Sequence, residues 1–223
     1  MKSEGKAIPK PARAFSPTAQ KRREKALKEK RARIMQAALT LFSKNGVSGT
    51  TVEQISELAN VSKSNLLYYF KSKDGLYLSV IPHLLDVWLS PLQSFSAEQE
   101  PVETLREYIK VKLEMSRDNP AESKLFCMEV VQGAPLLIKE LETPLKALLD
   151  AKSAVINEWI TAGKLNAVEP VHLIFSIWAI TQHYADFSVQ IKAVTGNDLS
   201  DPVFFESTLK NIQHIILDGL QPH

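Results

Sequence analysis

The chain of 223 residues is 44% hydrophobic and 23% charged, which is the composition of an ordinary folded protein with one or two domains. Its net charge of +2 hides an asymmetry, because residues 1–75 carry 16 Lys and Arg against 6 Asp and Glu, and residues 76–223 carry 11 against 19. This imbalance indicates that the N-terminal third meets a polyanion and that the rest of the chain does not.

Several classes of protein are excluded by what the sequence lacks. No run approaches the roughly 18 apolar residues of a membrane-spanning helix, and the N-terminus has no apolar core of a secretory signal. A single cysteine, Cys127, excludes an internal disulfide and a multi-cysteine metal site. Neither a glycine-rich phosphate loop nor a metal-ligand or catalytic spacing of the histidines is found. We therefore expect a cytoplasmic protein that is not an enzyme and has no cofactor or metal.

The N-terminal region divides into an arm and a helix. Residues 1–27 hold Pro9, Pro11 and Pro17 among small and basic residues, and we expect them to form a disordered basic arm. A helix is predicted at about 28–45, ending at Gly46. Its buried face is given by apolar residues at helical spacing, namely Ile34, Ala37, Ala38, Leu41 and Phe42.

Two short helices follow on a tight joint. Thr51 and Gln54 form a capping box for the first, whose predicted buried face is Val52, Ile55, Leu58 and Ala59. Ser62 caps the second, Lys63–Phe70, which is predicted to bury Phe70 with either Leu66 or Leu67. Asn60 stands at the joint, where it tolerates the left-handed conformation. This is the helix-turn-helix pattern, and we assign residues 28–75 to such a domain.

The remaining residues, 76–223, are predicted to form a larger helical domain. A long helix capped by Ser72 begins at Lys73, is kinked by Pro82, and ends near Leu89, before Pro91. Further helices are predicted at about 102–117, 121–132, 144–163, 170–194 and 202–219, with Thr143 and Pro144 as N-cap and first residue of the third. Since no stretch alternates with period two, the fold class is all-α.

The start of the second short helix carries side chains that can reach bases and phosphates of DNA. The candidate DNA-binding residues are hydroxyls, amides, aromatics and ammonium groups near helix N-termini, namely Thr51, Ser62, Lys63, Ser64, Asn65, Tyr68, Tyr69 and Lys73. The alternative is that the hydroxyl groups only cap helices and that the tyrosines only pack. Their order within the basic third favours the DNA-binding interpretation.

The segment AALTLFSKNGVSGTTVEQISELANVSKSNLLYYFKSKDGLYLSV, residues 37–80, resembles the DNA-binding domain of the TetR family of bacterial repressors. The shared pattern is A-x-x-L-F, then T-x-x-x-I-x-x-x-A-x-V-S, then L-Y-Y-F-x-S-K-x-x-L. The resemblance implies a homodimer that places its third helix in the major groove of a palindromic operator. It also implies that a small molecule in the C-terminal domain changes the spacing of the two DNA-reading heads.

The resemblance extends into the C-terminal region. The segments DVWLSPL, LFCMEVVQGAPLL, LKALLDAKSAVI and HLIFSIWAITQHYADF are similar to those of the pyrimidine-utilisation regulator of that family. This implies that the effector is uracil or thymine, bound in order to release the operator of pyrimidine-utilisation genes. The alternative is a TetR-type repressor that responds to a lipophilic drug or an acyl ligand, which a long apolar pocket would favour.

A pyrimidine site needs flat or aliphatic walls and an amide in the plane of the ring. Trp178 and Gln182 have the i, i+4 spacing that places both on one helical face, so that one could stack on a ring and the other bind its edge. The candidate ligand-binding residues are Trp88, Leu89, Phe175, Trp178, Gln182 and Tyr184. The alternative for the tryptophans is core packing. Glu114 and Arg117 of the 102–117 helix could be polar groups of the pocket, with Lys110 and Lys112 as weaker candidates, but we interpret all four as charges on a solvated face.

Dimerisation is expected through the last two helices. The final helix carries more apolar residues than one layer of a monomer buries, namely Phe204, Phe205, Leu209, Ile212, Ile216 and Leu220. Most of the basic excess lies before residue 34, with 12 Lys and Arg against 3 Glu. The arm is therefore expected to attract DNA without regard to sequence, while residues near 51 and 62–73 set position and readout.

Overall fold

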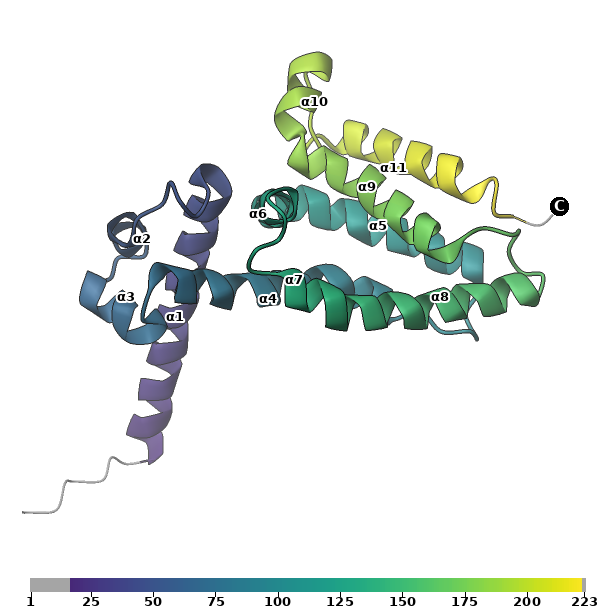
Figure 1. Ribbon diagram of the computed structural model, residues 1–223. Helices are drawn as coiled ribbons and strands as arrows, with labels where there is room; N and C mark the ends of the chain where they lie inside the picture. The colour runs from purple at the N-terminus through teal and green to yellow at the C-terminus, as the bar shows by residue number, and fades with distance from the viewer. Residues whose placement is uncertain (1–16, 222–223) are drawn as a thin grey trace, which may run out of the picture.

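The computed structural model describes residues 17–221, and these are helical with no strand among them, which confirms the all-α prediction. Helices α1 to α3 form a small head that stands beside a larger body, and α4 runs from one into the other (Figure 1). The helices of the head, with α4, are α1 (Pro17–Asn45), α2 (Val52–Leu58), α3 (Lys63–Phe70) and α4 (Lys73–Gln93). Those of the body are α5 (Pro101–Asp118), α6 (Pro120–Val131), α7 (Ile138–Glu140), the π-helical turn η1 (Leu141–Leu145), α8 (Lys146–Thr161), α9 (Pro170–Asp186), α10 (Ser188–Thr195) and α11 (Pro202–Leu217).

The first helix begins earlier than predicted. Residues 17–27, which we assigned to a disordered arm, continue α1 as a helix, and the rest of that arm lies outside the described residues. The run is rich in Lys, Arg, Glu, Gln and Ala, all strong helix formers, and Pro17 suits a first helical position. Lys25 and Glu29 add an i, i+4 ion pair at 3.9 Å. These local preferences outweigh the prolines, small residues and positive charges from which we inferred disorder.

The core of the head follows the predicted periodicity. Ile34, Ala38 and Phe42 of α1 are fully buried, as is Leu66 of α3, whereas Leu67 is only partly buried. Leu58 is an exception, because it is 52% exposed instead of buried. Ile55 of α2 and Ala59, directly after the helix, pack into the head core, and Leu58 does not.

Helix α4 joins the two cores of the molecule. Leu76, Tyr77 and Val80 pack into the core of the head, and Leu92 at the other end is fully buried in the core of the body. The helix therefore continues through Pro82 and Pro91 to Gln93, past the predicted end near Leu89. Burial of Leu92 favours an extra turn that the proline alone would oppose.

Two further boundaries were predicted wrongly. Thr143 and Pro144 do not start a helix, because they lie inside η1 and α8 begins at Lys146. The predicted helix 170–194 is two helices, α9 and α10, separated at Phe187. In the body, α5 packs against α9 and α11, and α6 lies against both α1 and α9 (Figure 1).

Candidate DNA interface and effector pocket

The first turn of α3 is held by local hydrogen bonds and leaves polar side chains exposed. The Ser62 hydroxyl accepts from the backbone N–H of Asn65 at 3.2 Å and lies 3.1 Å from the Ser64 hydroxyl. Ser62, Lys63, Ser64 and Asn65 are all exposed, while Leu66 and Phe70 anchor the opposite face in the head core. This arrangement presents one polar face of α3 to a partner, as a recognition helix requires.

The caps around this helix form as predicted. The Thr51 hydroxyl accepts from the Gln54 backbone N–H at 3.2 Å, and the Gln54 side-chain oxygen accepts from the Thr51 backbone N–H at 2.9 Å. Asn60 has a φ of 51°, the left-handed conformation expected of the joint. Thr51 thus caps α2. Because Thr51 is exposed, a DNA phosphate can approach the start of this helix.

Two lysines of the predicted interface have different surroundings. The ammonium of Lys63 forms an ion pair with Glu53 of α2 and remains largely exposed; this pairing lowers the pKa of the Glu53 carboxyl. The ammonium of Lys73 instead donates to the backbone carbonyls of Val47 and Thr50, at 2.8 and 2.9 Å. Lys73 therefore ties α4 to the loop between α1 and α2, which is a structural contact that the sequence analysis did not foresee.

The two tyrosines also differ. Tyr68 is 79% exposed, whereas Tyr69 is half-buried and packs against the head core. Their rings meet edge to face with centroids 5.5 Å apart. Tyr68 is thus free to reach a partner, and Tyr69 supports its position.

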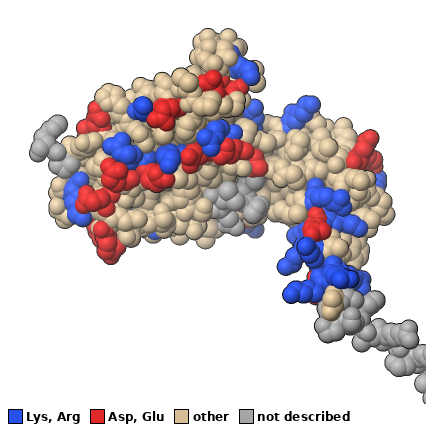
Figure 2. Space-filling view, turned by 180° about the vertical axis from the view of Figure 1, so that it is seen from behind, with Lys and Arg blue, Asp and Glu red and all other residues tan. Residues whose placement is uncertain are grey.

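Basic residues gather on the part of α1 that projects from the head. Figure 2 shows this cluster at the end of α1, whereas positive and negative groups alternate over the body. Residues 17–33 carry eight Lys and Arg against Glu24 and Glu29, and nearly all of their described side chains are exposed. The projecting half of α1 is therefore a solvated cationic rod joined to the head.

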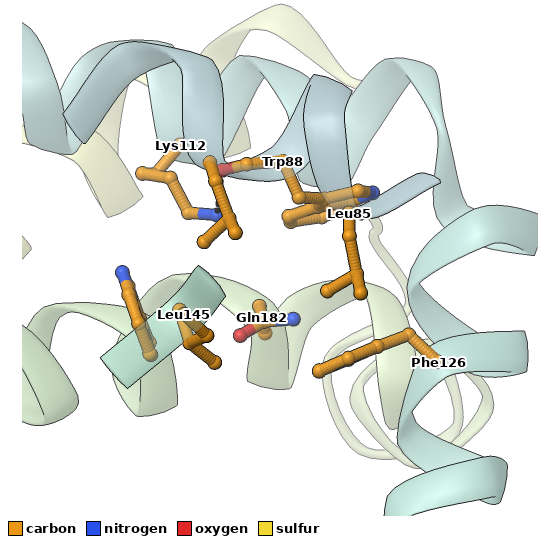
Figure 3. Close-up of a pocket in the computed structure, with 8 residues that line it drawn as sticks. Leu85, Trp88, Lys112, Phe126, Leu145 and Gln182 are labelled. Atoms are coloured by element: carbon orange, nitrogen blue, oxygen red, sulfur yellow. Dashed lines mark hydrogen bonds between the residues drawn. The ribbon is translucent and has the colours of Figure 1, made fainter. Parts of the chain in front are cut away.

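The body contains a small cavity where four helices and η1 meet. Its lining consists of Leu85, Trp88 and Leu89 from α4, Lys112 from α5, Phe126 from α6, Leu145 from η1, and Trp178 and Gln182 from α9. Figure 3 shows Lys112 and Trp88 on one side, facing Gln182 and Leu145 on the other. The cavity volume is about 30 Å³, room for one or two water molecules.

Four of the six predicted ligand-binding residues line this cavity, namely Trp88, Leu89, Trp178 and Gln182. Trp178 and Gln182 share the predicted face of α9. The Trp178 indole N–H donates to the Tyr108 hydroxyl at 2.6 Å, which fixes the ring. The Trp88 indole N–H is buried and has no hydrogen-bond partner among the described residues. A buried donor without a partner is costly, and Trp88 is therefore held in place by the packing of its ring and not by its N–H.

The other two predicted residues lie elsewhere. Phe175 is 45% exposed, lies outside the cavity lining and packs on Trp178 with ring centroids 5.6 Å apart and the two rings tilted by 45°. Tyr184 packs against Phe204 of α11 in the core of the body. Neither residue lies in the cavity lining, because Phe175 is one turn before Trp178 on α9 and Tyr184, two residues after Gln182, points from a different face of the helix.

Lys112 is the residue that the sequence analysis missed. It was interpreted as a solvated charge, yet its side chain is only 2% exposed and lines the cavity. Burial lowers the pKa of its ammonium to about 7, while Asp186 acts in the opposite direction. The i, i+4 spacing to Tyr108, which is also buried, was the one signal that could have placed it on the inner face of α5.

A buried hydrogen bond connects the body to the head. The Tyr77 hydroxyl of α4 donates to the Glu129 carboxylate of α6 at 2.6 Å, and the Leu136 backbone N–H donates to the same carboxylate at 2.8 Å. The ring of Tyr77 packs edge to face on Phe42 of α1. Since α4 and α6 also contribute cavity walls, a change in the cavity can reach the head through these two helices.

The apolar residues that we assigned to a dimer interface mostly lie inside the subunit. Phe205, Leu209, Ile212 and Leu220 are buried in the core of the body, and Phe204 and Ile216 pack against it. The exposed apolar side chains of α9 to α11 are instead Phe175, Phe187, Val189, Val194, Val203 and Ile215. We therefore correct the prediction that these six residues form the dimer interface. Helix α11 directs the face that carries them toward α5 and α9 of the same subunit.

Residues 17–221 include neither a membrane-spanning helix nor a cluster of metal-binding side chains. None of the helices in that range is long and apolar enough to cross a membrane. Among the same residues, no group of three His, Cys, Asp or Glu side chains is arranged to hold a metal ion.

Comparison with known proteins agrees with this architecture. Residues 34–80 match the family model described as bacterial regulatory proteins, tetR family, and residues 81–223 match that of the YcdC-like protein, C-terminal region. The chain is 54% identical over 201 residues to the HTH-type transcriptional regulator RutR of Escherichia coli K12, covering 90% of this chain and 95% of that protein. It is 27% identical to the regulator TcmR of Streptomyces glaucescens over 58% of this chain and 60% of that one.

Solved structures share the fold. A putative transcriptional regulator from Streptomyces coelicolor, SCO4942, aligns with a TM-score of 0.69 at 22% identity, covering 86% of this chain and 99% of that one. A putative fatty acid metabolism regulator from Clostridium perfringens aligns with a TM-score of 0.63 at 25% identity, covering 84% and 97%. With both of its halves matched and a relative at 54% identity, this chain belongs to the TetR family of helix-turn-helix transcriptional regulators.

Proposed function

We propose that this TetR-type regulator controls pyrimidine-utilisation genes and is released from its operator by uracil or thymine. The observation that carries the proposal is the cavity of the body, where Gln182 and Trp178 meet Trp88 among apolar walls. Similarity to RutR over nearly the whole chain, including the cavity segments, supports the same conclusion.

DNA binding is assigned to the exposed face of α3. Ser62, Lys63, Ser64, Asn65 and Tyr68 would read bases and phosphates of the major groove, with Thr51 contributing at the start of α2. The cationic half of α1 would contact flanking phosphates without regard to sequence. TetR regulators act as dimers, and we place the dimer contact on the exposed apolar side chains of α9 to α11, including Val203 and Ile215.

The size of the cavity suggests how a ligand would change DNA binding. A protein cavity that holds a benzene ring measures about 150 Å³, several times the volume found here. A pyrimidine would therefore have to push the walls apart, and three wall residues belong to α4, whose other end packs in the head. A ligand that prefers the widened state shifts the head and weakens operator binding by its difference in affinity for the two states.

A substitution in the cavity tests the proposal. Gln182→Ala should bind operator DNA as the wild type does without ligand, yet fail to be released by uracil in a gel-shift assay. Gln190→Ala, on the exposed face of α10, is the matched control and should respond normally. Release of the Gln182→Ala variant at the wild-type concentration of uracil would contradict the cavity assignment.

The alternative ligand class can be separated by a thermal-shift screen. The small cavity and its polar groups disfavour a long drug or acyl chain. Uracil and thymine should raise the melting temperature, whereas fatty acids and lipophilic dyes should not. A shift with fatty acids alone would replace the pyrimidine by the acyl class and leave the regulator assignment intact.

A further inference from the structure

Lys112 presents a buried ammonium to the cavity. Its nitrogen donates to the Trp88 carbonyl oxygen at 3.3 Å and lies 4.1 Å from the centre of the Trp88 ring. An ammonium has three donors and no acceptor, and the hydrogen bonds of the described side chains use one of the three. None of the described carboxylates forms an ion pair with it, although Asp186 lies close enough to attract it. A buried cation in this state favours a ligand atom that accepts a hydrogen bond.

Gln182 lies across the cavity from Lys112 (Figure 3). Its amide both donates and accepts, so it can pair with a ring edge that has one carbonyl and one N–H. Lys112 can only donate while it carries its charge. The two sides of the cavity therefore have different requirements: the Gln182 side tolerates donors and acceptors, and the Lys112 side demands an acceptor.

When Gln182 pairs with the ring edge that carries N1–H and the C2 carbonyl, position C4 lies on the opposite edge and faces Lys112, and the pyrimidines differ at that position. Thymine has an oxygen acceptor at C4, where cytosine has an amino donor. Uracil has the same oxygen as thymine without the methyl group. An oxygen facing Lys112 gains a charge-assisted hydrogen bond, whereas an amino group there would place two donors against each other and leave both unpaired.

We propose that Lys112 is the specificity-determining residue of the cavity and makes it select pyrimidines with an oxygen at C4 over those with an amino group. This inference rests on the proposed function and adds a rule of selection to it. A site that hydrogen-bonds a group of its ligand rejects an analogue that cannot pair by large factors. We therefore expect uracil and thymine to bind at least about 100-fold more tightly than cytosine.

The test is a set of titrations of the full-length protein with uracil, thymine and cytosine, followed by calorimetry at pH 6, where Lys112 keeps its proton. Lys112→Met keeps the apolar stem and removes the charge and the donors. It should lose about 100-fold in uracil affinity and bind cytosine within about tenfold of uracil. Lys112→Gln, whose amide can also accept, should gain affinity for cytosine relative to the wild type. Lys110→Met, an exposed lysine on the same helix, is the control and should keep the wild-type ratio.

The outcomes separate this inference from the proposed function. If the wild type binds uracil but Lys112→Met and Lys112→Gln keep the same preference over cytosine, the role of Lys112 is overturned and the pyrimidine function stands. If the wild type binds neither uracil nor thymine, both are overturned. Operator binding without ligand, measured for each variant, shows that it is folded.

Discussion

The head and the cavity of the body are built from different kinds of contact. In the head, the helix caps join groups only three residues apart, as with Ser62 and the Asn65 N–H or Thr51 and Gln54, and only the lysines reach partners farther along the chain. In the cavity, the nearest partners come from helices far apart in the sequence, as with Trp88 and Lys112 or Tyr108 and Trp178. A DNA-reading surface of this fold can therefore be encoded largely by local interactions, whereas its effector site exists only after the body has packed.

The largest expected effect tests the local geometry of the head. A Cβ atom on Gly75 would lie 2.4 Å from the Phe70 carbonyl oxygen, a backbone atom that cannot move without shifting the end of α3. Gly75→Ala should therefore lower the free energy of unfolding by about 3 kcal/mol. Chemical denaturation measures it, with Gly219→Ala as control, because a Cβ there meets nothing within 4 Å. Equal stability of the two variants would show that the joint between α3 and α4 is not tightly packed.

A smaller effect concerns the contact between head and body. Tyr77→Phe removes the donor to the buried Glu129 carboxylate and should cost about 2 kcal/mol in the free energy of unfolding. Tyr68→Phe, on the exposed ring, should leave stability unchanged. The two melting curves show whether stability is lost only when the buried hydroxyl of Tyr77 is removed. Equal loss in both variants would contradict this prediction.

Lys112 makes stability depend on pH in a defined direction. Its pKa is lowered to about 7 by burial, with Asp186 opposing, so above pH 7 the folded protein holds fewer protons than the unfolded chain, whose lysine titrates near 10.5. The free energy of unfolding should rise between pH 7 and 10, by at most about 1.4 kcal/mol per pH unit from this group. The rise should be missing from Lys112→Met when the two proteins are compared by urea denaturation at each pH. If the free energy of unfolding of the wild type and of Lys112→Met changed with pH in the same way, Lys112 would not be a buried lysine with a lowered pKa.

The smallest effects separate the two lysines of the head. Lys73→Met should cost about 1 kcal/mol in stability, because two backbone carbonyls lose their donor, and leave the salt dependence of DNA binding unchanged. Lys63→Met should hardly change stability, since an exposed ion pair contributes little, and should reduce the salt slope by about one. Fluorescence anisotropy over a salt series measures the slopes. A reduced salt slope for Lys73→Met would show that Lys73 contacts DNA, as the sequence analysis expected.

Features that depend on neighbours along the chain could be predicted from the sequence. The capping box of α2, the Ser62 cap of α3, the joint at Asn60 and the bounds of α3 follow from hydrogen bonds and conformational preferences that act within a few residues. The shared face of Trp178 and Gln182 follows from helical spacing in the same way.

Which helix faces are buried, and which residues they contact, became known from the tertiary structure alone. Packing in the body carries α4 past Pro91, turns the apolar face of α11 inward, and separates Phe175 and Tyr184 from the cavity. It also buries Lys112, whose charge suggests solvent when the sequence is considered alone. Burial of a side chain depends on its contacts with several helices that are far apart in the sequence. The sequence of one helix therefore does not predict it.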